Sequence, residues 1–316
     1  ITGGTGDITI GATSFDGDGF TKTSGTVTFN TAKVGSQSFA PGVTSSESHY
    51  DLGTSTVNFN VDGYGSTFQI EMHSGISKTL QITCDTLNIQ SKFQIYNTEG
   101  EGAGTYNTLK INGNLTVEAG EDFYTYYDTT SDYGSGVTVT GDVTLEGTFY
   151  GNAAALVTPM SFGSLTIESG GEYKATSGTT TITKSMHNNW NNAGTFTHND
   201  GLVHFTWTGT SYYFTPGTSD AGTNQTFYDL KLTGPDSSRY YAVASENYLF
   251  VENDLTIVEG ILQRYHDNTE TITVDGDVTL EDGGKLDWNT NNSSDKAATF
   301  GSLTIESGGT YDATSG

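Results

Sequence analysis

Five glutamates recur at one position of a short repeat, immediately after a strand-like apolar–Thr–apolar triplet. They are Glu118, Glu146, Glu168, Glu281 and Glu306. If the repeats stack in register, neighbouring carboxylates lie close together and repel each other. A hard cation relieves that repulsion, because Ca²⁺ prefers several oxygen ligands. The pattern therefore predicts either a solvated acidic face or a Ca²⁺ site, with Asp16 and Asp18 as a second candidate pair; no motif requires a cofactor.

Paired aromatic residues and sequons are the other candidates for binding. Exposed tyrosines stack on sugar rings or pack against a neighbouring chain, whereas buried ones fill the core. The tyrosine pairs are Tyr126 and Tyr127, Tyr212 and Tyr213, and Tyr240 and Tyr241. Sequons that permit N-glycosylation of a secreted chain begin at Asn224, Asn291 and Asn292. Glycans are therefore the candidate ligands, either bound or covalently attached.

All these residues belong to a repetitive chain. The segment FGSLTIESGG occurs at residues 162–171 and again, unchanged, at 300–309, which is 138 positions later. Its core is a Gly or Asn, then a Ser, Asp or Asn, then the apolar–Thr–apolar triplet, and copies begin at Gly6, Gly113, Gly141, Gly163, Asn253, Gly276 and Gly301. We predict one continuous array over residues 1–316, with super-repeats at about 6–140, 141–275 and 276–316, the last one incomplete. We also expect it to be a window on a longer repeat chain.

The repeats predict strands rather than helices. Apolar and polar residues alternate with a period of two, and no ten-residue stretch has a convincing helical period. In the triplet after Ser164, Leu165 and Ile167 should point inward, and Thr166 and Glu168 outward. A strand this short cannot bury its face alone. We therefore predict an all-β chain, a parallel β-helix or β-solenoid with coils of roughly 20–28 residues; tandem immunoglobulin-like β-sandwiches are the alternative.

The composition excludes several classes of partner. With 37 acidic and 12 basic residues the net charge is −25, so we expect no binding to nucleic acid or to anionic lipid. No apolar run approaches the roughly 18 residues of a membrane span. The single cysteine, Cys84, allows no intrachain disulfide, and its alternating neighbours place it at or near the core.

No catalytic motif emerges from the sequence, and we expect the protein not to be an enzyme. Polysaccharide lyases that resemble pectate lyase use an Arg base beside an Asp-bound Ca²⁺, but Arg239 and Arg264 lie in no recognisable motif. The closest histidines, His198 and His204, lack a metal-binding pattern. Among 37 acidic residues, carboxyl pairs at a glycosidase spacing occur by chance.

Three strings carry a resemblance to a known class of protein: AGTFTHNDGLVHFTWTG at 193–209, FYDLKLTG at 227–234 and NDLTIVEG at 253–260. They resemble the tandem repeats of very large bacterial and archaeal surface and adhesin-like proteins. The resemblance implies an extracellular or cell-surface location and a structural or adhesive role, and it carries no catalytic residues.

We therefore expect a stiff β-solenoid segment of a filament, sheath or adhesin stalk that associates with itself through its strand ends or side faces. The alternative is a carbohydrate-binding or polysaccharide-cleaving β-helix protein.

Overall fold

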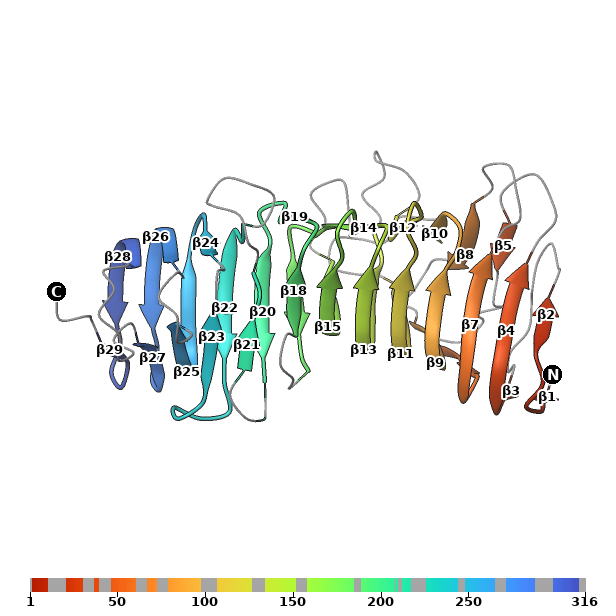
Figure 1. Cartoon of the computed structure of the whole chain (residues 1–316), viewed down its shortest axis with the longest axis horizontal. Helices are drawn as coiled ribbons and strands as arrows, with labels where there is room; N and C mark the ends of the chain where they lie inside the picture. Colours follow the sequence, from red (N-terminus) through yellow and green to blue (C-terminus); the bar gives the residue numbers. More distant parts are fainter. Residues whose placement is uncertain are drawn as a thin grey trace.

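A computed structural model describes residues 2–10, 21–30, 37–39, 47–60, 67–72, 79–97, 107–126, 134–151, 158–184, 189–207, 209, 212–216, 226–243, 248–264, 271–287 and 298–312. All regular elements in these residues are β-strands, and every ladder between them is parallel. The strands lie side by side along one axis, with the two ends of the chain at opposite ends (Figure 1). The predicted fold class, an all-β parallel solenoid, is confirmed.

Three columns of strands run along this axis. The first column is continuous from end to end. It contains β1 (Thr2–Gly3), β3 (Thr21–Lys22), β6 (Glu47–Asp51), β9 (Thr79–Ile89), β11 (Thr108–Val117), β13 (Gly136–Leu145), β15 (Met160–Ile167), β17 (Thr179–Ile182), β20 (Leu202–Thr206), β22 (Asp229–Thr233), β25 (Leu255–Arg264), β26 (Thr271–Leu280) and β28 (Ala298–Ile305).

The second column begins with β2 (Ile8–Ile10), β4 (Ser24–Asn30) and β7 (Thr54–Asn60). It continues through the C-terminal parts of β9, β11, β13 and β15 to β18 (Trp190–Asn192). A bridge between Asn191 and Thr215 leads on to β21 (Tyr212–Phe214), β23 (Tyr240–Val243), the end of β25, β27 (Gly284–Asp287) and β29 (Thr310–Asp312).

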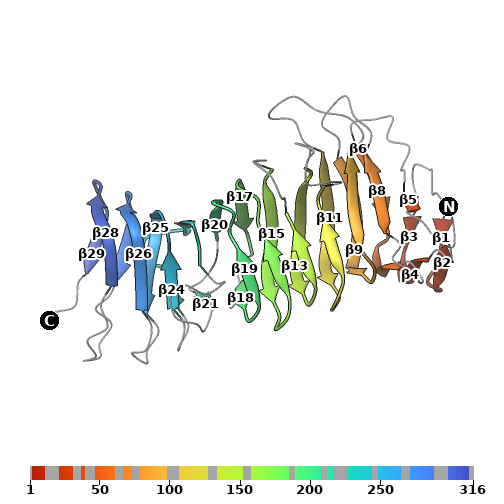
Figure 2. The same ribbon diagram turned by 90° about the horizontal axis from the view of Figure 1, so that it is seen from above.

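The third column contains β5 (Gln37–Phe39), β8 (Phe68–Met72), β10 (Phe93–Asn97), β12 (Asp122–Tyr124), β14 (Thr148–Tyr150), β16 (Glu172–Lys174) and β19 (Thr195–Thr197). Beyond β19 the ring of Phe227 lies 5.7 Å from that of Phe196, and Phe227 bridges to Val251. β24 (Tyr248–Val251) and the N-terminal parts of β26 and β28 complete the column. Figure 2 shows the same stack of coils from above.

Coil lengths follow directly from the register. Met160 pairs with Thr180, 20 positions later, whereas Val57 pairs with Leu87, 30 positions later. The coils of the N-terminal part therefore extend slightly beyond the predicted length. The ladders between coils are nevertheless parallel, with a register shift in four of them.

The alternation of the sequence builds the core as predicted. Leu165 and Ile167 are fully buried, Thr166 is half-buried and Glu168 is exposed. The third column adds an internal row of aromatic rings, in which Phe123 stacks on Phe149 with 4.6 Å between centroids. One apolar core runs through the described coils, from Val27 to Leu286.

The two identical segments, however, do not lie in the same columns. Leu165 lies in the second column, where it pairs with Val143. Leu303 lies in the first column, where it pairs with Val278. Followed from coil to coil, this column reaches Met160, at the other end of β15 from Leu165. The repeat motif therefore moves round the rod by one column between β15 and β25.

Candidate functional site

The predicted glutamates form two separate columns rather than one. Glu118, Glu146 and Glu168 follow the second-column ends of β11, β13 and β15. The residue before each glutamate pairs with the residue before the next one. Glu281 and Glu306 follow β26 and β28 in the first column. The two sets lie on different faces because the motif changes column between them.

A cation site at these glutamates stays a prediction. Within the described residues, no group of three or more His, Cys, Asp or Glu side chains is arranged to hold a metal ion. Glu118 Oε1 accepts a hydrogen bond from Gln90 Nε2 at 2.7 Å, while Glu146 and Glu168 are exposed. Asp16 and Asp18 lie outside the described residues.

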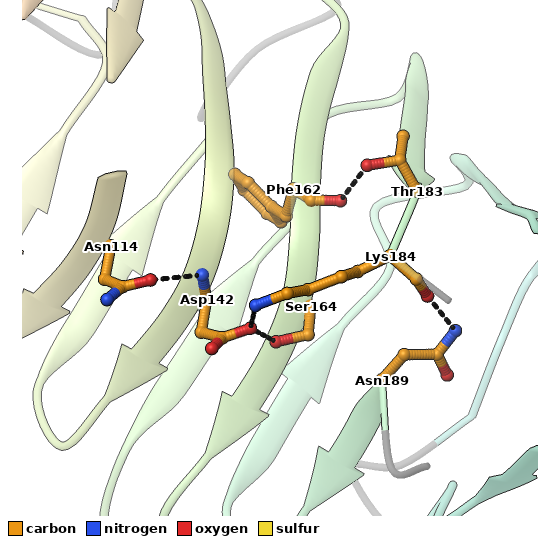
Figure 3. A network of polar contacts seen from close by, with 7 residues as sticks. All are labelled: Asn114, Asp142, Phe162, Ser164, Thr183, Lys184 and Asn189. Carbon is orange, nitrogen blue, oxygen red and sulfur yellow. Dashed lines mark hydrogen bonds and ion pairs between the residues drawn. The ribbon is translucent and has the colours of Figure 1, made fainter. Parts of the chain in front are cut away.

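A polar network that sequence reasoning missed lies where the second-column parts of β11, β13 and β15 begin (Figure 3). The backbone N–H of Asp142 donates to Asn114 Oδ1 of the preceding coil at 2.9 Å. The Asp142 carboxylate accepts a hydrogen bond from Ser164 Oγ of the following coil at 2.6 Å. Lys184 Nζ lies 2.5 Å from the same oxygen, Asp142 Oδ1. Four residues from different coils are thereby joined across the outer surface of the rod.

The arrangement of this network suits cohesion rather than catalysis. Ser164 donates its proton to a carboxylate, and the Lys184 ammonium is held by the same carboxylate. Burial raises the pKa of Asp142, but the hydrogen bonds from Lys184 and Ser164 outweigh it and hold that pKa below its ordinary value. An ionised Asp142 accepts the Ser164 proton and does not withdraw it, so the contact does not form an activated serine.

The same device recurs in the second half of the chain. Asp254 N–H donates to Asp229 Oδ1, and Asp277 N–H donates to Asp254 Oδ1, both at 3.0 Å. Ser302 Oγ then donates to Asp277 Oδ1 at 2.6 Å. The signal for this ladder was present in the sequence, because each motif copy carries Asn, Asp or Ser before its triplet. That residue links one coil to the next, in addition to any role in turning the chain.

Two of the tyrosines proposed for binding are core residues. Tyr241 is buried against Trp207, with 3.9 Å between ring centroids. Tyr126 is also buried, which raises its pKa above the ordinary value. Both are thereby removed from the predicted binding surface. Tyr213 and Tyr240 are half-buried, whereas Tyr127 and the side chain of Tyr212 lie outside the described part of the chain.

A different aromatic strip faces outward on the third column. Tyr124 and Tyr150 stack at 4.3 Å, with Lys92 Nζ 4.7 Å from the centroid of the first ring and Lys174 Nζ 4.6 Å from that of the second. Tyr124 donates a hydrogen bond to Asp122 at 3.0 Å, and desolvation together with this bond raises the pKa of Tyr124. The ring faces are thus occupied by each other and by the lysines. They form no open platform for a sugar.

The two histidines occupy separate environments. His198 Nδ1 accepts the Asp200 N–H at 3.0 Å, and its Nε2 lies 3.4 Å from Glu252. His204 Nε2 lies 3.0 Å from Thr233 Oγ1. Burial, with a further contribution from Lys231, lowers the pKa of His204. These contacts are local and do not bring the histidines together as a ligand pair.

The remaining predictions concern cysteine, glycosylation and arginine. Cys84 is buried, as predicted. The sequons at Asn224, Asn291 and Asn292 lie outside the described residues, so glycosylation stays a prediction. Arg239 makes a local ion pair with Asp236 at 3.7 Å.

No helix in the described part of the chain is long and apolar enough to cross a membrane. Comparison with family models, with curated proteins and with solved structures gave no match.

Proposed function

We propose that this chain is a stiff structural element of an extracellular filament, sheath or adhesin stalk. The observation that carries the proposal is the single apolar core, which runs through the described coils from Val27 to Leu286. Each coil buries its strands only against its two neighbours, so rigidity arises along the axis. A molecule built in this way suits a mechanical role better than a chemical one.

The outer surface supports the same role. Asn, Asp and Ser side chains join neighbouring coils, as at Asn114, Asp142 and Ser164. The net charge of −25 keeps rods soluble and favours a medium in which cations screen the repulsion. The extracellular location itself rests on this acidity and on the resemblance of the repeats to those of large surface proteins.

Self-association is proposed through strand ends or side faces. In the coil of β28 and β29, Ile305 is 48% exposed, and Leu303 and Tyr311 are partly buried. In the identical segment at 162–171, Leu165 and Ile167 are fully covered by the next coil. Unpaired strand edges in general template pairing with a further strand, and outward side faces are the other candidate contact.

Electron microscopy of the purified native material, with and without EDTA, tests the proposal. We expect long uniform fibres. If the fibres fray in EDTA, that result would indicate that cations bound at the glutamate columns help to hold them together. Dispersed short particles would contradict the structural role. They would direct the work to glycan arrays and polysaccharide digestion, which test the carbohydrate-binding or carbohydrate-cleaving alternative.

A further inference from the structure

The motif changes from the second column in β15 to the first column in β25, which divides the rod into two halves. β25 itself still runs from the first column into the second. In the N-terminal half, β11, β13 and β15 each run from the first column into the second. In the C-terminal half, β26 and β28 each run from the third column into the first. We call the described residues 189–207, 212–216 and 226–243, where the halves meet, the junction.

Backbone pairing across the junction is uneven. The first column is intact, because β20 pairs with β17 on one side and β22 on the other. In the second column, the connection between β18 and the next coil is, among the residues that the structure describes, one bridge from Asn191 to Thr215. In the third column, no ladder joins β19 to Phe227 among the described residues. By contrast, β11 and β13 share seven register pairs across two columns, and β12 and β14 pair in the third.

Aromatic packing takes the place of the missing ladders. The Trp190 ring lies 5.0 Å from Phe196 and 5.1 Å from Phe227. Phe205 packs against Tyr241 at 5.6 Å, and Trp207 lies over the same ring at 3.9 Å. Such contacts stabilise the fold, but they lack the register of a hydrogen-bonded ladder.

The junction also contains buried polar atoms with no partner among the residues that the structure describes. Asn192 occupies the core position that Ile167 occupies one coil earlier, and it is 1% exposed. Its Nδ2, the Trp190 Nε1 and the Asn189 Oδ1 have no hydrogen-bond partner among the described residues. Unpaired buried polar groups destabilise the folded state. These atoms therefore weaken the junction in the same coil whose second-column and third-column pairing with the next coil is reduced.

We propose that the junction is the yield point of the rod, which opens under heat or tension before either half unfolds. In a linear stack, each coil is stabilised mainly by its immediate neighbours, so opening begins at the weakest interface. The two halves then behave as separate cooperative units. This inference concerns the rod itself and does not depend on its belonging to a filament.

The chain contains its own reporters, because Trp190 and Trp207 both lie in the junction. The third tryptophan, Trp288, is removed by Trp288→Phe to give the reference protein. Thermal unfolding is followed by tryptophan emission and by far-ultraviolet circular dichroism. We expect the emission midpoint to lie about 5 °C or more below the main loss of β-structure, which corresponds to a difference of order 1–2 kcal/mol. Hydrogen exchange should be faster in β18 and β20 than in β13 and β26.

Two variants sharpen the test. Asn192→Val removes the unpaired Nδ2 together with the Oδ1 that accepts the Gly194 N–H at 3.1 Å. Because an unpaired buried polar group costs more than one such hydrogen bond contributes, this variant should narrow the gap between the midpoints, whereas Phe227→Ala should widen it. Phe123→Ala is the matched control, because Phe123 is equally buried but lies in the middle of the N-terminal half; it should lower the β-structure midpoint and leave the emission midpoint in place. Coincident transitions in the reference protein, with uniform exchange protection, would overturn the proposal whatever the variants do.

Discussion

Leu165 and Leu303 occupy the same position in two identical ten-residue segments, but they lie in different columns of the solenoid. Each coil offers three similar faces, all of which require apolar side chains inward and polar side chains outward. The motif satisfies that requirement on any of them. It therefore specifies a strand and the corner that follows, but not the face on which the strand lies.

Close approach of the backbone explains the second glycine of the motif. A Cβ on Gly171 would lie 2.1 Å from the carbonyl oxygen of Leu145, which accepts the Glu168 N–H. We expect Gly171→Ala to lower the free energy of unfolding by about 2–3 kcal/mol. Gly170→Ala is the matched control: that residue has φ of 93° and open space around it, so only the left-handed conformation costs about 1 kcal/mol. Urea denaturation measures both; equal losses would contradict the steric explanation.

The Asp142 network should make part of the stability depend on acid. Because the pKa of Asp142 is held below its ordinary value, its contribution is complete above the unfolded-state pKa and is lost as pH falls through the folded-state pKa. We expect Asp142→Asn to cost about 0.5–1 kcal/mol at pH 7, since the Lys184 and Asp142 side chains are 34% and 44% exposed and solvent screens their attraction, and less below pH 3. Asp277→Asn is the control, because Asp277 bonds Ser302 but has no ion pair within the described residues. If the denaturation midpoints of both variants respond identically to pH, the ion pair with Lys184 makes no contribution to the pH dependence of stability.

The internal aromatic row should be far more important for stability than the external one. Phe149 is fully buried and stacks on Phe123, so Phe149→Ala should cost about 3–5 kcal/mol. Its neighbour Tyr150 stacks on Tyr124 at the outer surface, and Tyr150→Ala should cost about 1 kcal/mol. Equilibrium unfolding compares the two variants. A larger loss of unfolding free energy for Tyr150→Ala would contradict the assignment of Phe149 to the core and of Tyr150 to the outer face.

Burial should make the only thiol unreactive in the native state. Desolvation, with a smaller contribution from Asp85, raises the pKa of Cys84 to about 12, so almost no thiolate exists at pH 8. We expect an aromatic disulfide reagent to label Cys84 only after unfolding in urea. Rapid stoichiometric labelling of the folded protein would show that β9 opens locally at Cys84, between its first-column and second-column parts.

The sequence predicted the fold because alternation with a period of two, as in Leu165 and Ile167, has few other solutions in strands this short. It could not predict the contact between Lys184 and Asp142, which are 42 positions apart, because that contact depends on the lengths of two intervening coils. The burial of Tyr241 beside half-buried Tyr240 depends in the same way on the phase of one strand. The glutamates were correctly placed after their strands, but their division between two faces follows from the change of column, which no single repeat encodes.

The most direct test of the proposed role is diffraction from oriented native fibres, or cryo-electron microscopy of the same material. If the rod is the structural unit, its strands lie across the fibre and its coils repeat along it. We then expect a strong axial repeat of about 4.8 Å. Fibres without this repeat, or native material that forms no fibres, would contradict the account.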